Sequence, residues 1–112
     1  MSHVTTHILD ISTGKPAASV NVVLEMQQPG GWQLLTRGAT DANGRIMNML
    51  PDERVLTPGI YRLTFDTRTY FFSMHTKSFY PAVYVEFEIT DDSHYHVPLL
   101  LSPYGFSTYR GS

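Results

Sequence analysis

Two histidines stand at alternate positions near the end of the chain, in the run HYHVPLLL that begins at His94. Alternate residues of a β-strand share a face, so His94 and His96 are predicted to lie on one side of a strand whose other side is apolar. A third histidine, His7, stands in another alternating run near the start of the chain. Imidazole titrates close to neutral pH, so it can take a proton from water and return it to a leaving group. Two such side chains at one site would suit a hydrolysis reaction.

The same residue types would also suit a metal centre. His7, His94 and His96 offer three nitrogen ligands and leave a fourth position open for water, as in catalytic zinc sites. The sequence has no evident acidic residue placed to orient these imidazoles from behind. A histidine taken singly on a strand is more often structural than catalytic. The residues alone therefore leave acid–base catalysis, a zinc site and a structural role open.

An arginine at the exit of a tight turn is a further candidate. The run Asp41-Ala42-Asn43-Gly44 predicts a turn in which Asn-Gly supplies the positive φ that such turns need, and Arg45 follows it directly. In isolation, an arginine at such a place is more often a solvated surface charge. A guanidinium group can nevertheless hold two oxygen acceptors at once, which would suit an anionic substrate.

Short runs rich in Val, Thr, Tyr and Phe, separated by Gly and Pro, indicate an all-β protein. Strands are predicted at residues 5–11, 20–27, 32–40, 60–65, 83–90 and 94–101, with a further short segment at 46–50. Asp66 is placed to cap a short helix that ends before Pro81. The turn at 91–93 predicts a hairpin between the strands at 83–90 and 94–101. Seven or eight short strands of this kind indicate a β-sandwich.

The alternation also predicts which faces are buried. In the first strand, the face that carries His7 is the more apolar one, because it also holds Leu9 and Ile11. In the second strand the apolar face runs from Val20 to Met26. In the last strand the core face is the one opposite His94 and His96. The predicted core faces consist of three sets: in the first strand Thr5, His7, Leu9 and Ile11; in the second Val20, Val22, Leu24 and Met26; and in the last Tyr95, Val97, Leu99 and Leu101.

Length and charge exclude several classes of protein. The chain has 112 residues, and we expect one domain over residues 1–112 with its own core. It has no cysteine, so disulfides and thiolate metal sites are excluded. The net charge of −2 argues against nucleic acid, whose binding needs a basic surface. No membrane span or signal peptide is evident, so we expect no membrane partner and a cytoplasmic location, or a periplasmic one if a leader was removed.

The end of the chain carries a resemblance to a known family. The tetrapeptide Tyr109-Arg110-Gly111-Ser112, the run HYHVPLLLSP before it and THILD at residues 6–10 resemble the transthyretin-related proteins that act as 5-hydroxyisourate hydrolases. Residues 14–17, 40–45 and 78–81 fit the same family, so the resemblance spans nearly the whole chain. It implies a transthyretin-like β-sandwich of two four-stranded sheets with one short helix. It also implies a homotetramer, a dimer of dimers, with its active sites at a subunit interface.

The resemblance further implies an activity and a set of site residues. The activity is hydrolysis of 5-hydroxyisourate to 2-oxo-4-hydroxy-4-carboxy-5-ureidoimidazoline in urate degradation, without a metal or other cofactor. The implied catalytic residues are His7, Arg45 and His96. The implied substrate-binding residues are these three together with Tyr109, Arg110, Gly111 and Ser112, with Ser112 closing the pocket. Which histidine acts as the base stays open.

Two other functions remain as alternatives. The same scaffold could be a transthyretin-like carrier of hydrophobic iodinated hormones, or a structural sandwich without a small-molecule site. His7, Arg45, His96 and the terminal tetrapeptide favour the enzyme, because a carrier channel would favour apolar or simple charged residues. A purely structural sandwich leaves the polar face of the last strand unexplained.

Overall fold

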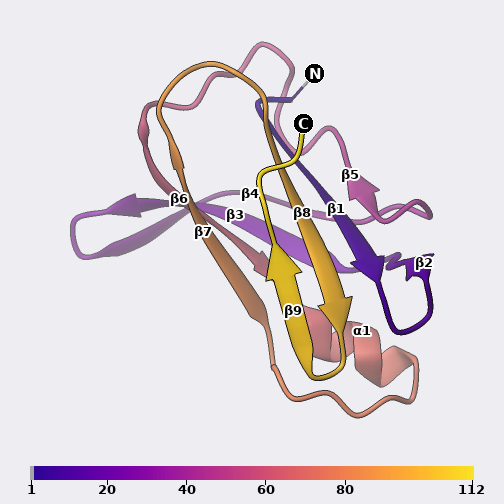
Figure 1. Cartoon of the computed structure of the whole chain (residues 1–112). Coiled ribbons are helices and arrows are strands. Elements are labelled where there is room, and N and C mark those ends of the chain that lie inside the picture. The colour runs from indigo at the N-terminus through magenta and orange to yellow at the C-terminus, as the bar shows by residue number, and fades with distance from the viewer. Residues whose placement is uncertain (1) are drawn as a thin grey trace.

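Two β-sheets face each other in the computed structural model, which describes residues 2–112 (Figure 1). We call them sheet A and sheet B. Sheet A contains, in spatial order, β2 (Lys15–Pro16), β1 (Val4–Asp10), β8 (Tyr95–Ser102) and β9 (Gly105–Thr108), and the two-residue β5 (Arg45–Ile46) also pairs with β1. Sheet B contains β4 (Gly31–Ala39), β3 (Asn21–Gln28), β6 (Gly59–Phe65) and β7 (Val83–Ile89). The predicted sandwich of two four-stranded sheets is confirmed, with β5 as a small addition to sheet A.

The core lies between the sheets and is built from the predicted alternation. Tyr95, Val97, Leu99 and Leu101 of β8 are all buried, and so are Val22 and Leu24 of β3. Burying one side chain of this size contributes about 1.5–3 kcal/mol. The core faces expected for the second and last strands are therefore confirmed.

The expected face of β1 is wrong. The side chains of Val4, Thr6 and Ile8 are fully buried in the sandwich, whereas His7 and Leu9 are only half-buried. Polar groups are tolerated on this core face because they are hydrogen-bonded: the Thr6 hydroxyl donates to the Val97 carbonyl at 2.7 Å. The face that carries His7 is thus the outer face of sheet A.

The predicted hairpin between residues 83–90 and 94–101 is also wrong. β7 pairs with β6 in sheet B, whereas β8 pairs in parallel with β1 and antiparallel with β9 in sheet A. The segment between them crosses from one sheet to the other, as Figure 1 shows. Asp91 stabilises this crossing by accepting hydrogen bonds from the Ser93 backbone N–H at 3.1 Å and from the Tyr95 hydroxyl at 3.0 Å. Two strands with a buried side can belong to either sheet, and alternation alone does not decide which.

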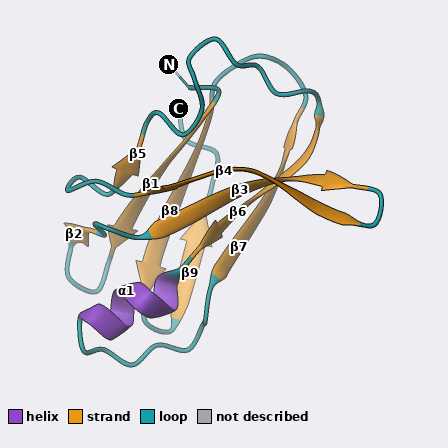
Figure 2. Ribbon diagram, turned by 180° about the vertical axis from the view of Figure 1, so that it is seen from behind, coloured by secondary structure: helices purple, strands orange, loops and turns teal. Residues whose placement is uncertain are grey.

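The helix α1 (Thr67–Ser73) lies at one end of the sandwich (Figure 2). The carboxylate of Asp66 caps it by accepting from the Thr69 N–H at 3.2 Å, as predicted. Phe71 is buried in the core, and the Tyr70 hydroxyl donates to the Asp10 carboxylate at 2.7 Å, which ties the helix to β1. Within residues 2–112, no helix has the length and apolar character that crossing a membrane requires.

Candidate active site

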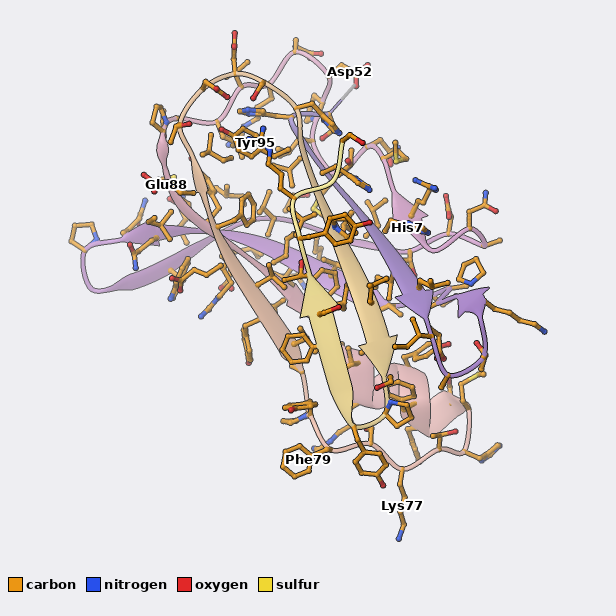
Figure 3. All side chains as sticks on the ribbon, viewed as in Figure 1. His7, Asp52, Lys77, Phe79, Glu88 and Tyr95 are labelled. Carbon is orange, nitrogen blue, oxygen red and sulfur yellow. The ribbon has the colours of Figure 1, made fainter. Side chains whose placement is uncertain are left out.

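Strand pairing brings the three predicted catalytic residues to the outer face of sheet A. His7 of β1 is paired with Arg45 of β5. On the other edge of β1, Thr5 is paired with His96 of β8, and His7 is paired with Pro98. Paired residues of neighbouring strands point to the same side of a sheet. Figure 3 labels His7 beside β1 and Tyr95 near the start of β8.

Arg45 is held beside β1 by a tight corner. The Asp41 carboxylate accepts from the backbone N–H groups of Asn43 at 2.8 Å and Arg45 at 3.0 Å. Gly44 has a φ of 74°, and its carbonyl accepts from the Ile8 N–H at 2.8 Å. A Cβ atom at this glycine would lie 2.5 Å from the Ile8 carbonyl oxygen. The predicted turn is confirmed, and its glycine is required both for backbone conformation and for close approach to β1.

His94 and His96 are joined through a threonine that sequence reasoning missed. Thr5 Oγ1 lies 2.9 Å from His94 Nε2 and 2.7 Å from His96 Nδ1. His94 Nδ1 lies 2.8 Å from the Ser2 carbonyl oxygen. Thr5 is fully buried, although it lies on the outer face of sheet A. The one signal for Thr5 in the sequence is its alternate-residue spacing from His7.

The electrostatic surroundings keep both predicted catalytic imidazoles neutral. Burial lowers the pKa of His96, and the nearby His94, Arg45 and His7 lower it further. Burial also lowers the pKa of His7, as does Arg45, while the Asp41 carboxylate partly offsets these effects. Arg45 acts on both histidines, so the three side chains form one electrostatic cluster. Each imidazole is a proton acceptor at neutral pH.

The donor geometry does not fit the three-histidine zinc site. Both nitrogens of His94 are already hydrogen-bonded, to Ser2 and to Thr5, so neither is directed at a shared ion. The rings of His94 and His96 stack, with centroids 6.2 Å apart and planes 18° from parallel. In the described part of the chain, no group of three His, Cys, Asp or Glu side chains is placed to hold a metal ion.

The chain end returns to β8 beside His96. After β9, the Gly111 N–H donates to the His96 carbonyl at 2.8 Å, forming an isolated antiparallel bridge. A Cβ atom at Gly111 would lie 2.6 Å from Cδ2 of His96 and 3.1 Å from Cγ of Pro98. Only glycine therefore lets the chain end pass so close to the imidazole.

Arg110 lies on the opposite face of β8 from His96. Its guanidinium group lies 4.2 Å from the centre of the Tyr95 ring and donates to Ser93 Oγ and to the His94 carbonyl, both at 3.2 Å. It thus fixes the chain end rather than contacting the imidazoles within this chain. Tyr109 and Ser112 are exposed. The substrate-binding roles of Tyr109, Arg110, Gly111 and Ser112 stay predictions.

Two surface cavities lie away from the imidazoles. One of about 750 Å³ is bordered by α1 and the following loop, with Arg68, Phe72 and Lys77 in its wall. Another of about 260 Å³ lies between β7 and the chain end, with Glu88 and Arg110 in its wall. Neither cavity is lined by His7, Arg45 or His96.

Comparison with known proteins places this geometry in context. Residues 4–111 match the transthyretin family, described as the HIUase/transthyretin family. A 5-hydroxyisourate hydrolase of Salmonella dublin is 52% identical over 109 residues, which cover 96% of this chain and 79% of the relative.

Solved structures of two kinds share the fold. The 5-hydroxyisourate hydrolase of Klebsiella pneumoniae superposes with a TM-score of 0.87 at 40% identity, covering 99% of this chain and all of that chain (100%). Sea bream transthyretin in complex with thyroxine superposes with a TM-score of 0.90 at 32% identity, covering 97% and 94%. The fold is therefore common to a hydrolase and a transthyretin that was solved with thyroxine. From the match over residues 4–111 and the identity with the Salmonella relative, this chain belongs to the HIUase/transthyretin family.

Proposed function

We propose that this chain hydrolyses 5-hydroxyisourate in urate degradation, adding water to open the six-membered ring and give 2-oxo-4-hydroxy-4-carboxy-5-ureidoimidazoline. The observation that carries this proposal is the cluster of His7, Arg45 and His96 on the outer face of sheet A. The relative from Salmonella, at 52% identity, is a 5-hydroxyisourate hydrolase, which supports the same conclusion. We treat residues 1–112 as one hydrolase domain.

The site chemistry favours an enzyme over a carrier. The fold does not separate the two functions, because a hydrolase and a transthyretin superpose on this chain almost equally well. Two neutral imidazoles beside a guanidinium group are suited to move protons and to stabilise negative charge. A site that only bound a hydrophobic hormone would need neither property.

The proposed reaction needs no group beyond water and these side chains. A neutral imidazole, of His7 or His96, removes a proton from water as the water oxygen attacks the ring carbonyl carbon. The Arg45 fork binds the anionic, oxygen-rich substrate and stabilises the negative charge that develops on the carbonyl oxygen. When the C–N bond breaks, the proton is delivered to the leaving nitrogen.

The proposed assembly is a homotetramer, a dimer of dimers, with each site at a subunit interface. Around the imidazoles, the outer face of sheet A carries the apolar side chains of Leu9, Pro98 and Leu100. A polar cluster set among apolar residues is well suited to be covered by a partner subunit. In this arrangement Ser112, next to Gly111, completes the pocket.

A spectroscopic assay tests the proposed activity. 5-Hydroxyisourate is generated from urate by urate oxidase, and its absorbance is followed with and without the protein. We expect a faster decay with the wild-type chain and with His75→Asn, because His75 is exposed at the far end of α1. The double variant His7→Asn and His96→Asn should give the spontaneous rate. A wild-type decay equal to the spontaneous rate would defeat the hydrolase proposal.

A further inference from the structure

A continuous chain of hydrogen bonds runs behind His96. It begins at the Ser2 carbonyl, which lies 2.8 Å from Nδ1 of His94. Nε2 of His94 lies 2.9 Å from Thr5 Oγ1, and this oxygen lies 2.7 Å from Nδ1 of His96. Thr5 is fully buried, so water does not compete for its hydroxyl. The Thr5 hydroxyl therefore has to be satisfied by the two imidazoles that flank it.

Counting donors and acceptors assigns the protons. A carbonyl oxygen only accepts, so Nδ1 of His94 carries a hydrogen. With His94 neutral, its Nε2 is an acceptor and must receive the single hydroxyl proton of Thr5. The Thr5 oxygen then accepts from Nδ1–H of His96. This is the one arrangement that satisfies all three contacts with both imidazoles neutral, and it leaves Nε2 of His96 as a bare acceptor.

The bare nitrogen is also the one that is available to react. Nε2 of His96 has no hydrogen-bond partner among the described residues, whereas Nδ1 is engaged by Thr5. The Gly111 backbone packs against the Cδ2 edge of the ring, which holds the ring plane in place. A base needs its lone pair fixed in direction as well as in protonation state.

We propose that Thr5 and His94 are positioning residues that hold His96 in the tautomer with Nε2 unprotonated. When His96 removes a proton from water, a proton passes from His96 through the Thr5 hydroxyl to His94. The inference rests on the proposed hydrolase function and deepens it, because it names Nε2 of His96 as the base.

The proton transfer is balanced without any further reactant. Nε2 of His96 receives a proton from water, Nδ1–H of His96 passes its proton to Thr5 Oγ1, and the Thr5 hydroxyl proton moves to Nε2 of His94. His96 and Thr5 end neutral and His94 ends as an imidazolium. When the C–N bond of the substrate breaks, the three shifts reverse and the leaving nitrogen receives the proton.

The surroundings disfavour a positive charge on His96. Burial lowers its pKa, and the nearby His94, Arg45 of β5 and His7 of β1 lower it further. On His94, Nδ1–H donates to the Ser2 carbonyl whether the ring is neutral or protonated. Asp41 also acts on His7 in this cluster, and Arg110 donates to the His94 carbonyl from the opposite face of β8.

Nuclear magnetic resonance of the substrate-free protein tests the tautomer. In spectra of ¹⁵N-labelled imidazoles at neutral pH, we expect His96 to carry its hydrogen on Nδ1. Thr5→Val removes the hydroxyl at nearly constant shape and should release His96 into a mixture of tautomers. Thr6→Val is the matched control, because Thr6 is equally buried on the same strand but bonds to the Val97 carbonyl in the core. It should leave the tautomer of His96 unchanged.

Turnover of 5-hydroxyisourate tests the proton uptake. Thr5→Val should lower kcat by a factor on the order of 10–100 with little change in KM, the scale for losing a hydrogen-bond partner that orients a working imidazole. Thr5→Ser, which keeps the hydroxyl, should recover most of that loss. In His94→Gln the amide can accept from Thr5 and donate to Ser2 but cannot take up a proton. It should keep the tautomer and lose about tenfold in kcat.

The outcomes that overturn the proposal are separate from a failure of the hydrolase function, because the tautomer is measured without substrate. A wild-type His96 with its hydrogen on Nε2 would refute the positioning role, with no substitution needed. An unchanged tautomer in folded Thr5→Val would refute it as well. Full turnover in His94→Gln would refute the uptake of the proton by His94.

Discussion

The two faces of β8 carry different kinds of side chain, although they belong to one strand. Its inner face holds Tyr95, Val97, Leu99 and Leu101 in the core, and its outer face holds His96, Pro98 and Leu100 around the candidate site. The chain end repeats this division. The guanidinium group of Arg110 packs over the Tyr95 ring, and the next residue, Gly111, packs against the His96 ring.

In β8, side chains that stabilise the fold and side chains of the candidate site alternate along the strand. Side chains of the inner face stabilise the fold because they are buried, and polar groups are tolerated there only where they are hydrogen-bonded. Side chains of the outer face hold imidazole nitrogens and a hydroxyl group in fixed orientations, and this face is only partly buried. Substitutions on the two faces should therefore have different consequences, and the following predictions probe that difference.

The largest expected effect is a difference between His96 and Leu99: substituting His96 should affect kcat, and substituting Leu99 should affect the free energy of unfolding. His96→Asn should lower kcat by a factor on the order of 10²–10⁴ while the free energy of unfolding stays close to that of the wild type. Leu99→Ala, in the inner face, should lower the free energy of unfolding by about 2–5 kcal/mol because it leaves a cavity. The 5-hydroxyisourate assay and urea unfolding measure the two quantities. Equal stability losses in both variants would contradict the separation of the faces.

The next effect concerns the chain end. Deleting Tyr109–Ser112 removes the backbone bridge to His96 and the contact of Arg110 with Tyr95, but it leaves β9 intact. We expect most of the hydrolysis to be lost with little change in the far-ultraviolet circular dichroism. An affinity tag after Ser112 should be similarly damaging, and a tag at the N-terminus should be far milder. Equal activities of the two tagged proteins would remove the chain end from the site.

Gly111→Ala probes the chain end with a single added methyl group, and its expected effect is smaller. The added Cβ would lie 2.6 Å from Cδ2 of His96, so either the ring or the chain end must move. A displacement of this size should lower kcat on the order of 10²-fold. Gly105→Ala is the control, because a Cβ there meets only the Ser102 hydroxyl at 3.7 Å. Wild-type kinetics in Gly111→Ala would mean that the ring position of His96 is unimportant.

Arg45→Lys should weaken the outer face without moving the strands. A lysine keeps the charge beside His7 but cannot hold two oxygen atoms as a guanidinium fork does. We expect a loss of catalytic efficiency, kcat/KM, on the order of tenfold or more, and an unchanged melting temperature. Arg37→Lys on β4 of sheet B serves as the control. Full activity of Arg45→Lys would place substrate binding elsewhere.

The smallest expected effect is a shift of the pH profile. Because the folded protein lowers the pKa of His7 and His96, the loss of activity on acidification should begin below about 6.5, the ordinary value for histidine. The same sign applies to stability. The unfolded chain binds protons at a higher pH than the folded chain, so the free energy of unfolding should fall as pH drops from about 6.5 through the lowered pKa values. Titration of the two imidazoles by nuclear magnetic resonance gives these values directly.

Local features were predictable from the sequence wherever a residue type has one strong structural preference. The inward face of β8, the cap at Asp66 and the turn before Arg45 were predicted on this basis. The outer position of His7 was missed, because β1 has polar and apolar side chains on both faces and hydrogen bonds decide between them.

Features that depend on distant partners were not predictable in the same way. The crossing between β7 and β8 follows from which sheet each strand joins, and this choice is made by β6 and β1 rather than by the intervening turn. Thr5 carries no chemical signal by itself. It became recognisable only when the parallel pairing of β1 with β8 placed it between two imidazoles.

The origin of the strands in each sheet bears on how the protein folds. All strands of sheet B come from the continuous middle of the chain, residues 21–89, whereas sheet A joins β1 to β8, so that Thr5 and His96 meet across 91 positions of sequence. Contacts between distant segments form late, because closing a long loop costs entropy before any contact repays it. During refolding, fluorescence of the single tryptophan, Trp32 of β4, should therefore recover before hydrolysis does. The joining of the two ends of the chain would then be a late step that has to precede catalysis.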